Sequence, residues 1–134
     1  MTLANALNSK LVTYLSNPVD LTTLGSTQLF TTLTSGENFL VIQVVTYQTS
    51  LVGINTVAQW NLGWNNPTYD NIYASQSSFD AVGAGASEAG NIQSVGGEQF
   101  LVPPNTPVFT DITLASTAAT STVRFVVTGI YVTP

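Results

Sequence analysis

Short runs of apolar, β-branched and aromatic residues, separated by Gly, Pro and Asn, follow one another along most of the chain. The run at 58–64 alternates between apolar and polar side chains, which is the period of a strand with one buried face. The other runs have the composition of strands bounded by turns. The predicted strands lie at residues 28–34, 39–48, 54–64, 69–74, 99–102, 107–114 and 122–133.

This pattern predicts an all-β protein, either a two-sheet antiparallel β-sandwich or a jelly roll of seven to eight strands. A parallel α/β fold would require a helical run between successive strands, and the residues after position 20 offer none. Residues 75–97 are rich in Gly, Ala and Ser, and we interpret them as a long surface excursion because strand patterning resumes after them. The chain of 134 residues has the length of one domain.

The N-terminal segment carries leucines at intervals of four residues, at Leu3, Leu7, Leu11 and Leu15. This spacing places all four on one stripe of a helix, although a short strand over 10–15 would also put the last two on one face. The segment either packs against its own domain or forms an arm that grips a neighbouring subunit.

A boundary follows this segment at Asn17-Pro18, because proline disfavours a helical conformation in the residue before it. The residues that follow, up to position 27, have the Asn, Asp, Thr and Gly content of a loop. We therefore predict an N-terminal arm or short helix with a loop over residues 1–27, and a β-sandwich domain over residues 28–134.

Two of the predicted strands are apolar on both faces, at 39–47 and 123–132. A strand in a two-layer fold buries one face and exposes the other to water, so the second face of these strands should also be covered. The residues on the second face are Leu40, Ile42, Val44, Val126, Ile130 and Val132. They are candidate interface residues, together with the four N-terminal leucines. The cover is either part of this chain, from the N-terminal segment or the 75–97 loop, or a neighbouring subunit or another protein.

Charged residues make up only 7% of the chain, whereas apolar residues make up 44%. Charge is depleted at the centres of protein interfaces, so this composition favours a protein neighbour as the cover. Seven acidic residues oppose two basic ones, Lys10 and Arg124, for a net charge of −5. Nucleic acids and anionic membrane surfaces are bound by basic patches, so we expect neither partner. The sequence also contains no apolar run long enough to span a membrane.

Two absent residue types exclude much of the common enzyme chemistry. The sequence contains no Cys and no His, which removes disulfides, catalytic thiols, the Ser-His-Asp triad and the commonest metal ligand. The available acids, Asp70, Asp80, Glu88 and Glu98, fall in or near predicted loops, where acids are usually solvated. We expect no enzymatic activity, no metal site and no cofactor.

Four aromatic residues form a candidate binding platform for sugars. They are Trp60, Trp64, Tyr69 and Tyr73. Exposed rings could stack on a sugar, and the neighbouring Asn and Asp side chains could bond to its hydroxyl groups. The two tryptophans share their strand face with Ala58 and Leu62, however, which indicates core packing. The stretch NNPTYDN at 65–71 is equally typical of a turn.

Four segments of the chain carry a family resemblance. They are FLVPPNTPVF at 100–109, TGI at 128–130 in the last strand, ENFLVIQVV at 37–45 and NNPTYDNI at 65–72. With the Ala/Ser/Thr-rich loop before the last strand, they resemble small β-sandwich virion proteins of tailed bacteriophages. The resemblance covers roughly residues 28–134. Its motifs are architectural and contain no functional signature.

The resemblance implies a structural role, as a capsid decoration (cement) protein, a head fibre or the head of a tail fibre. From it we expect a virion protein, made in the host cytoplasm, that forms a homo-oligomer, preferentially a trimer. Its expected partners are the major capsid protein or other virion proteins. The favoured function is a cement protein that stabilises the shell by bridging neighbouring subunits. The alternative is a receptor- or carbohydrate-binding β-sandwich of a phage tail fibre.

Overall fold

The computed structural model describes residues 11–53, 57–78, 87–90 and 101–133. Over these residues it contains ten strands and no helix, which confirms the all-β class. The strands are β1 (Leu11–Leu15), β2 (Val19–Asp20), β3 (Gly25–Thr31), β4 (Asn38–Val52), β5 (Ala58–Gly63), β6 (Tyr73–Ser78), β7 (Ser87–Gly90), β8 (Leu101–Val102), β9 (Pro107–Leu114) and β10 (Thr120–Val132).

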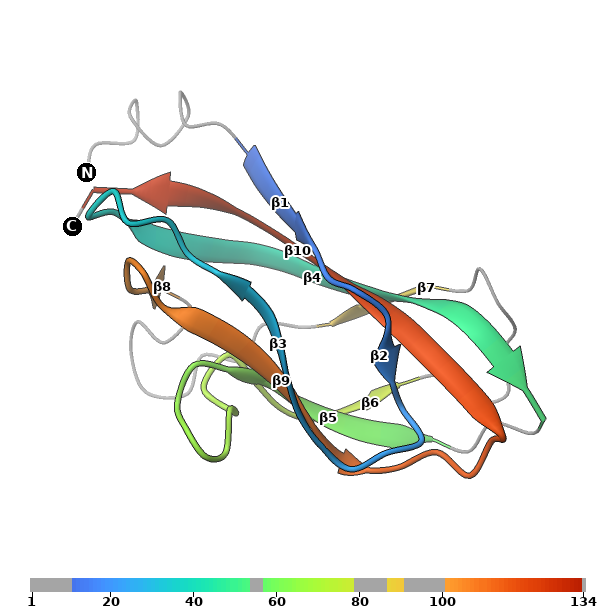
Figure 1. Cartoon of the computed structure of the whole chain (residues 1–134). Coiled ribbons are helices and arrows are strands. Elements are labelled where there is room, and N and C mark those ends of the chain that lie inside the picture. The colour runs from blue at the N-terminus through green and yellow to red at the C-terminus, as the bar shows by residue number, and fades with distance from the viewer. Residues whose placement is uncertain (1–10, 54–56, 79–86, 91–100, 134) are drawn as a thin grey trace.

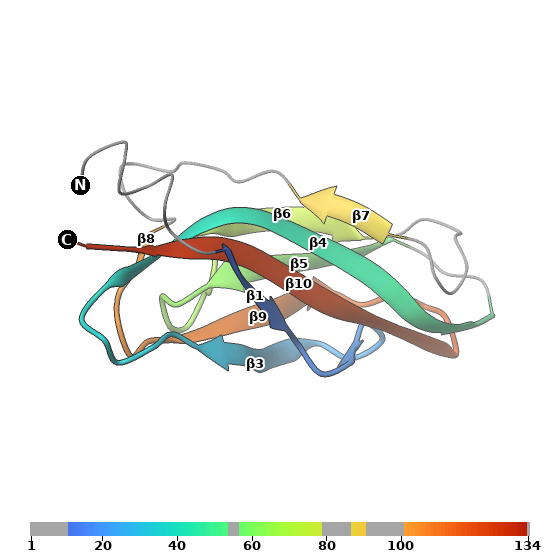
Figure 2. The same cartoon turned by 90° about the horizontal axis from the view of Figure 1, so that it is seen from above.

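The strands form two antiparallel sheets, which Figures 1 and 2 show as separate layers. The first, sheet A, has the order β1-β10-β4-β7, and the second, sheet B, has the order β3-β9-β5-β6. In sheet A, β2 also pairs with β10 and β8 also pairs with β4. Because β4 lies along the whole length of β10, β1 and β2 must share the other side of β10. The same argument places β7 and β8 together beside β4. Sheet A therefore contains six strands but is only four strand positions wide.

Several expected boundaries differ from the structure, and the strand expected at 28–34, for example, is β3 at Gly25–Thr31. Residues 69–71 belong to a turn, and the strand that we expected at 69–74 begins only at Tyr73. The 75–97 excursion contains the end of β6 and all of β7, which pairs with β4. Residues 11–27 contain β1, β2 and the start of β3, all paired into the sheets. β1 corresponds to the short strand that the sequence allowed over 10–15, whereas β7, with the sequence SEAG, has no apolar period that would reveal it.

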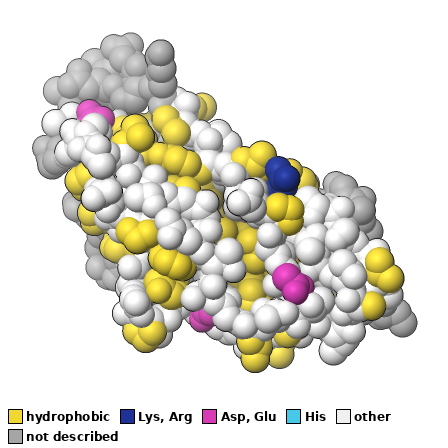
Figure 3. Space-filling view, viewed as in Figure 1, with side chains coloured by type: hydrophobic (Ala, Val, Ile, Leu, Met, Phe, Trp, Pro, Cys, Tyr) yellow, Lys and Arg dark blue, Asp and Glu magenta, His cyan; other side chains and the backbone are white. Residues whose placement is uncertain are grey.

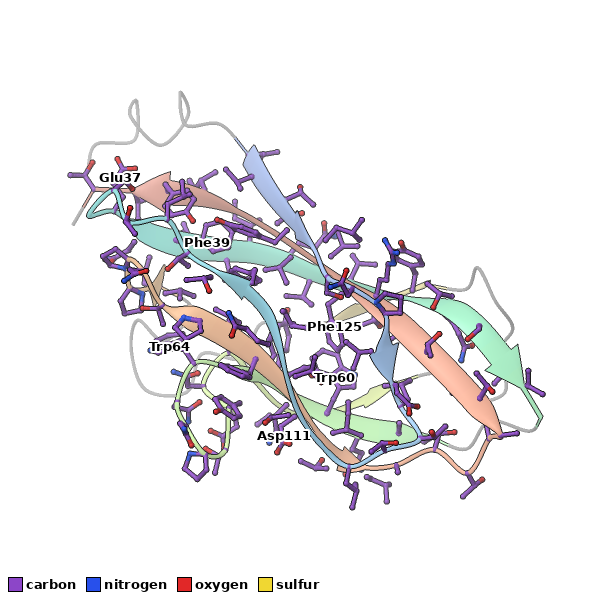
Figure 4. All side chains as sticks on the ribbon, viewed as in Figure 1. Glu37, Phe39, Trp60, Trp64, Asp111 and Phe125 are labelled. Atoms are coloured by element: carbon purple, nitrogen blue, oxygen red, sulfur yellow. The ribbon has the colours of Figure 1, made fainter. Side chains whose placement is uncertain are left out.

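The core lies between the inner faces of the two sheets. Its centre is the contact between Trp60 of β5 and Phe125 of β10, whose ring centroids lie 4.9 Å apart at 89°. Figure 4 shows the two side chains pointing toward each other from opposite layers. Val123 and Val127 on β10 and Leu62 on β5 are also buried beside this pair. The two sheets are thus joined by interdigitating apolar side chains from β10 and β5, which lie at inner positions of their sheets.

A β-bulge in β4 changes which residues face the core. The pairing with β10 skips Ile42, because Gly129 lies opposite Val41 and Thr128 lies opposite Gln43. Val41 and Val44 are both buried, whereas Ile42 is 48% exposed. An extra residue breaks the alternation with period two and reverses the faces beyond it. Our prediction that Val44 shares an outer face with Leu40 and Ile42 was therefore wrong, and Val45 takes that place.

An aromatic cluster closes one end of the core. Tyr14 of β1 stacks on Phe30 of β3 with centroids 4.1 Å apart, and Phe39 meets both rings edge-on. The hydroxyl groups of Tyr14 and Tyr131 are hydrogen-bonded to each other. The Tyr131 hydroxyl also accepts a hydrogen bond from the Leu33 backbone N–H at 2.8 Å. Burial, followed by the hydrogen bond with Tyr131, raises the pKa of Tyr14. The cluster joins β1 and β10 of sheet A to β3 of sheet B.

Replacing Phe125 with alanine should destabilise the fold by about 3–5 kcal/mol, because it removes a fully buried ring and leaves a cavity beside Trp60. The matched control is Val126→Ala at the next residue, which lies on the opposite face and is partly exposed. It should cost about 1 kcal/mol or less. Urea unfolding monitored by tryptophan fluorescence measures both values. Equal losses for the two variants would contradict the assignment of the faces.

Candidate interaction surface

The outer face of sheet A carries several apolar side chains that are exposed or partly exposed. This apolar outer face consists of Leu11, Leu15, Leu40, Ile42, Val45 and Val126. Leu15 lies opposite Val126, which lies opposite Val45, so these three form one row across three strands. Leu11 and Leu15 are 67% and 54% exposed. An exposed apolar group of this kind, with a row across three strands, is typical of a protein–protein contact.

The polar groups of the same face are almost all uncharged. Thr13 and Thr128 face each other across β1 and β10 with their hydroxyl oxygens 3.3 Å apart. Arg124 is partly exposed opposite Tyr47, farther along the same face. On the side of the molecule seen in Figure 3, which includes both sheets, charged side chains are few among the hydrophobic and neutral ones. Such a face can be desolvated at low cost, because little charge has to leave water.

The outer face of sheet B has a different character. Ser26, Asp111 and Asn61 form one row across β3, β9 and β5, while the next row holds Gln28 and Phe109. The Phe109 ring is covered by the Tyr69 ring, with centroids 4.6 Å apart. The polar rows of sheet B suit contact with water. Because the outer face of sheet A is apolar by comparison, sheet A is the candidate interaction surface.

The interface residues expected from the sequence fall into three groups. Leu11, Leu15, Leu40, Ile42 and Val126 lie on the apolar outer face. Val44, Ile130 and Val132 are buried within the chain, with 0%, 8% and 5% exposure. Leu3 and Leu7 lie outside the described residues. Leu11 and Leu15 belong to a strand rather than a helix. Residues 11, 13 and 15 of β1 are exposed, and the residues between them are half-buried.

The four aromatic residues of the sugar-platform alternative do not form an exposed platform. Trp60 is 2% exposed and Tyr73 is fully buried, with ring centroids 5.8 Å apart. Tyr69 is also buried and stacks on Phe109, and Trp64 is half-buried against the core. The buried rings of Trp60 and Tyr73 offer no face for stacking on a sugar.

The turn at 65–71 uses its polar side chains to hold itself together. The Asn65 amide donates to the Asp70 carboxylate at 2.6 Å, and its carbonyl oxygen accepts from the backbone N–H groups of Asp70 and Asn71. Thr68 donates to the same carboxylate at 2.9 Å. Gly63 lies so close to the side chains of Asn65 and Asn71 that no side chain fits there. These groups are engaged within the turn, as the turn interpretation of the sequence expects.

No group of three or more acidic side chains gathers to hold a metal ion among the residues that the structure describes. Of the four acids considered above, Asp80 and Glu98 lie outside that part of the chain. The hydrogen bond from the Asn65 amide, with that from Thr68, holds the pKa of Asp70 below its usual range. The Thr22 hydroxyl does the same for the pKa of Asp20. Within the described ranges there is also no helix of the length and hydrophobicity needed to cross a bilayer.

No protein-family model and no curated protein matches this sequence. One solved structure has a similar fold, a chain described as "Cyanophage Pam1 capsid asymmetric unit". The TM-score is 0.56 and the sequences are 17% identical, over 94% of this chain and 86% of that chain. At this identity the likeness is one of fold, and it extends over almost the whole of both chains.

Acid should destabilise the protein partly through Asp20 and Asp70. Their folded-state pKa values are lowered, so the stability they contribute is present above about pH 4 and is lost as the pH falls through their folded pKa values. The double variant Asp20→Asn/Asp70→Asn should show a flatter decline of Tm between about pH 5 and pH 2. Glu37→Gln serves as a control that removes one carboxylate elsewhere. Unchanged slopes in the double variant would refute the role of these two groups.

Proposed function

We propose that this chain is a non-enzymatic structural protein of a bacteriophage virion, synthesised in the host cytoplasm and incorporated into the particle. The observation that carries the proposal is the fold likeness to a chain of the Pam1 capsid unit, which spans 94% of this chain. A likeness over nearly the full length of both chains concerns the architecture as a whole rather than a single motif. The family resemblance seen in the sequence supports the same role.

The strand order supports a jelly-roll sandwich as the architecture. Each sheet has four lateral positions, β1/β2-β10-β4-β7/β8 and β3-β9-β5-β6. Along the chain, each position lies in the other sheet from the one before it, except that β5 and β6 are neighbours in sheet B. This is the arrangement of a double Greek key, which is common in viral capsid domains. It supplies two broad outer faces, and in this chain one of them is apolar.

Within the virion, we assign the chain the role of a capsid decoration (cement) protein that bridges neighbouring subunits. The apolar outer face of sheet A supplies the contact area, and buried apolar area stabilises an interface by about 25 cal/mol per Å². The neutral Thr side chains, such as Thr13 and Thr128, add hydrogen bonds without desolvating charge. The partners are the major capsid protein or other virion proteins, and further copies of this chain in a homo-oligomer, preferentially a trimer.

The tail-fibre alternative, a receptor- or carbohydrate-binding module, receives no comparable support. Its aromatic residues are packed against the core or against each other, and the polar groups of the turn at 65–71 bond to one another. The bridging role therefore accounts for more of the observed surface than a sugar-binding role does.

The decisive experiment is to purify particles of the phage that encodes this chain, by density-gradient centrifugation, and to quantify the chain by mass spectrometry. A stoichiometric amount in DNA-filled heads, and heads of lower thermal stability when the gene is deleted, are the expected results. Absence from the particles would refute the virion role. Presence only in tails would refute the cement role and favour the tail-fibre alternative.

Substitutions on the apolar outer face should weaken attachment to the particle. Ile42→Asn removes one exposed apolar side chain, and burial of such a side chain contributes about 2 kcal/mol, which corresponds to roughly thirtyfold in the dissociation constant. Leu114→Asn is a matched control, because Leu114 is also 48% exposed but lies at the end of β9 in sheet B. Binding of each purified variant to heads that lack the protein gives the comparison. Equal affinity of the two variants would contradict the assignment of this face.

A further inference from the structure

One edge of sheet B is open for pairing with another strand. β3 is the terminal strand of the described part of this sheet and pairs only with β9. Residues 25–28 of β3 are all exposed. Edge strands are commonly protected by charged residues or proline, and β3 contains neither. A bulge at Leu29 ends the regular edge, so the open stretch is Gly25 to Gln28.

A cavity of about 260 Å³ opens beside this same stretch, between β2 and β3. Residues 25–27 form one wall, and Ile112, a core residue of β9, lies at its inner side. Leu24, which is 62% exposed, also lines it. An open strand edge with an adjacent side-chain cavity has the two parts of a β-augmentation site, because the backbone supplies hydrogen bonds and the cavity selects a side chain.

The cavity contains one charged group, the carboxylate of Asp20. Its Oδ1 accepts hydrogen bonds from the Thr22 N–H at 2.8 Å and the Thr22 hydroxyl at 2.7 Å, while Oδ2 accepts from the Thr23 hydroxyl at 2.9 Å. These donors fix the carboxylate in place and favour its ionised form. A carboxylate oxygen has room for more than one donor, so Oδ2 can accept a further hydrogen bond. The complementary ligand group is a cationic side chain.

We propose that residues 25–28 accept an extended strand of a neighbouring virion protein, which places a Lys or Arg side chain in the cavity against Asp20. The inference deepens the proposed function and rests on it, because it identifies a second contact of the bridging protein. The added strand hydrogen-bonds to the free N–H and C=O groups of β3. Its basic side chain donates to the Asp20 carboxylate, while its stem packs on Ile112 and Leu24.

The composition of the chain argues that this strand comes from a different protein rather than from a second copy. The chain contains two basic residues, Lys10 and Arg124. Arg124 lies within β10, the strand between β4 and the β1/β2 edge, and cannot be donated without dismantling sheet A. Lys10 adjoins β1, which is itself paired with β10.

The first test uses the purified protein and two synthetic strand peptides, acetyl-TVKVT-amide and acetyl-TVEVT-amide. Amide chemical shifts in ¹⁵N-labelled protein report where each peptide binds. We expect shifts concentrated on residues 25–28 with the lysine peptide, and at least about tenfold weaker binding of the glutamate peptide. Asp20→Asn should abolish the difference between the peptides, whereas Glu37→Gln should preserve it. Shifts elsewhere, or no preference for lysine, would overturn the inference.

The second test uses phage particles with a photo-crosslinking residue at Thr27, and at Leu33 as an exposed control. The expected product at Thr27 joins the chain to a Lys- or Arg-containing segment of another virion protein. A crosslink to a second copy, or the same products from both positions, would refute the inference while leaving the virion role intact. Absence of the chain from particles would instead refute the proposed function, and the peptide experiment would still decide the chemistry of the edge.

Discussion

The contact between the two sheets at Trp60 and Phe125 is the interaction on which the rest of the structure depends. Neither sheet can bury its inner face alone, and this edge-to-face pair lies where the inner faces meet. β10 contributes Phe125 to the core and also pairs with β1, β2 and β4. One strand therefore organises both the core and sheet A. On the side of β10 away from β4, Ser16 bridges the gap between β1 and β2. Its backbone N–H donates to the Phe125 carbonyl, and its hydroxyl accepts from the Phe125 N–H.

Once the inner faces are occupied, the two outer faces are free to differ, and they do. Sheet B presents the polar row of Ser26, Asp111 and Asn61, whereas sheet A presents Leu11, Leu15 and Ile42. The bulge in β4 contributes to this difference, because it turns Ile42 outward and Val44 inward within one strand. A protein that bridges subunits requires such an asymmetry, since one face must be desolvated while the other remains in water.

Much of the strand content follows from local pattern, and so do parts of the candidate surface. The alternation at 58–64 predicts β5, and it also predicts that Trp60 and Leu62 are buried, as they are. The run at 39–48 lies within β4, and the run at 122–133 matches β10 except for its last residue. The pattern failed at β7 and in the face of Val44. β7, with the sequence SEAG, has no apolar period. The face of Val44 depends on a bulge that is visible only in the pairing of β4 with β10.

By itself, the sequence determined the all-β class, the positions of the long strands, the scarcity of charge and the exclusion of thiol and histidine chemistry. These properties belong to residue types and to local periodicity, which do not change with folding. The tertiary structure alone decided which apolar residues remain exposed and which edge is open. Leu11 and Ile130 are opposite each other in one sheet, yet one is 67% exposed and the other 8%. Exposure is a property of neighbouring strands, and the neighbours of each strand are set by pairing across the whole chain.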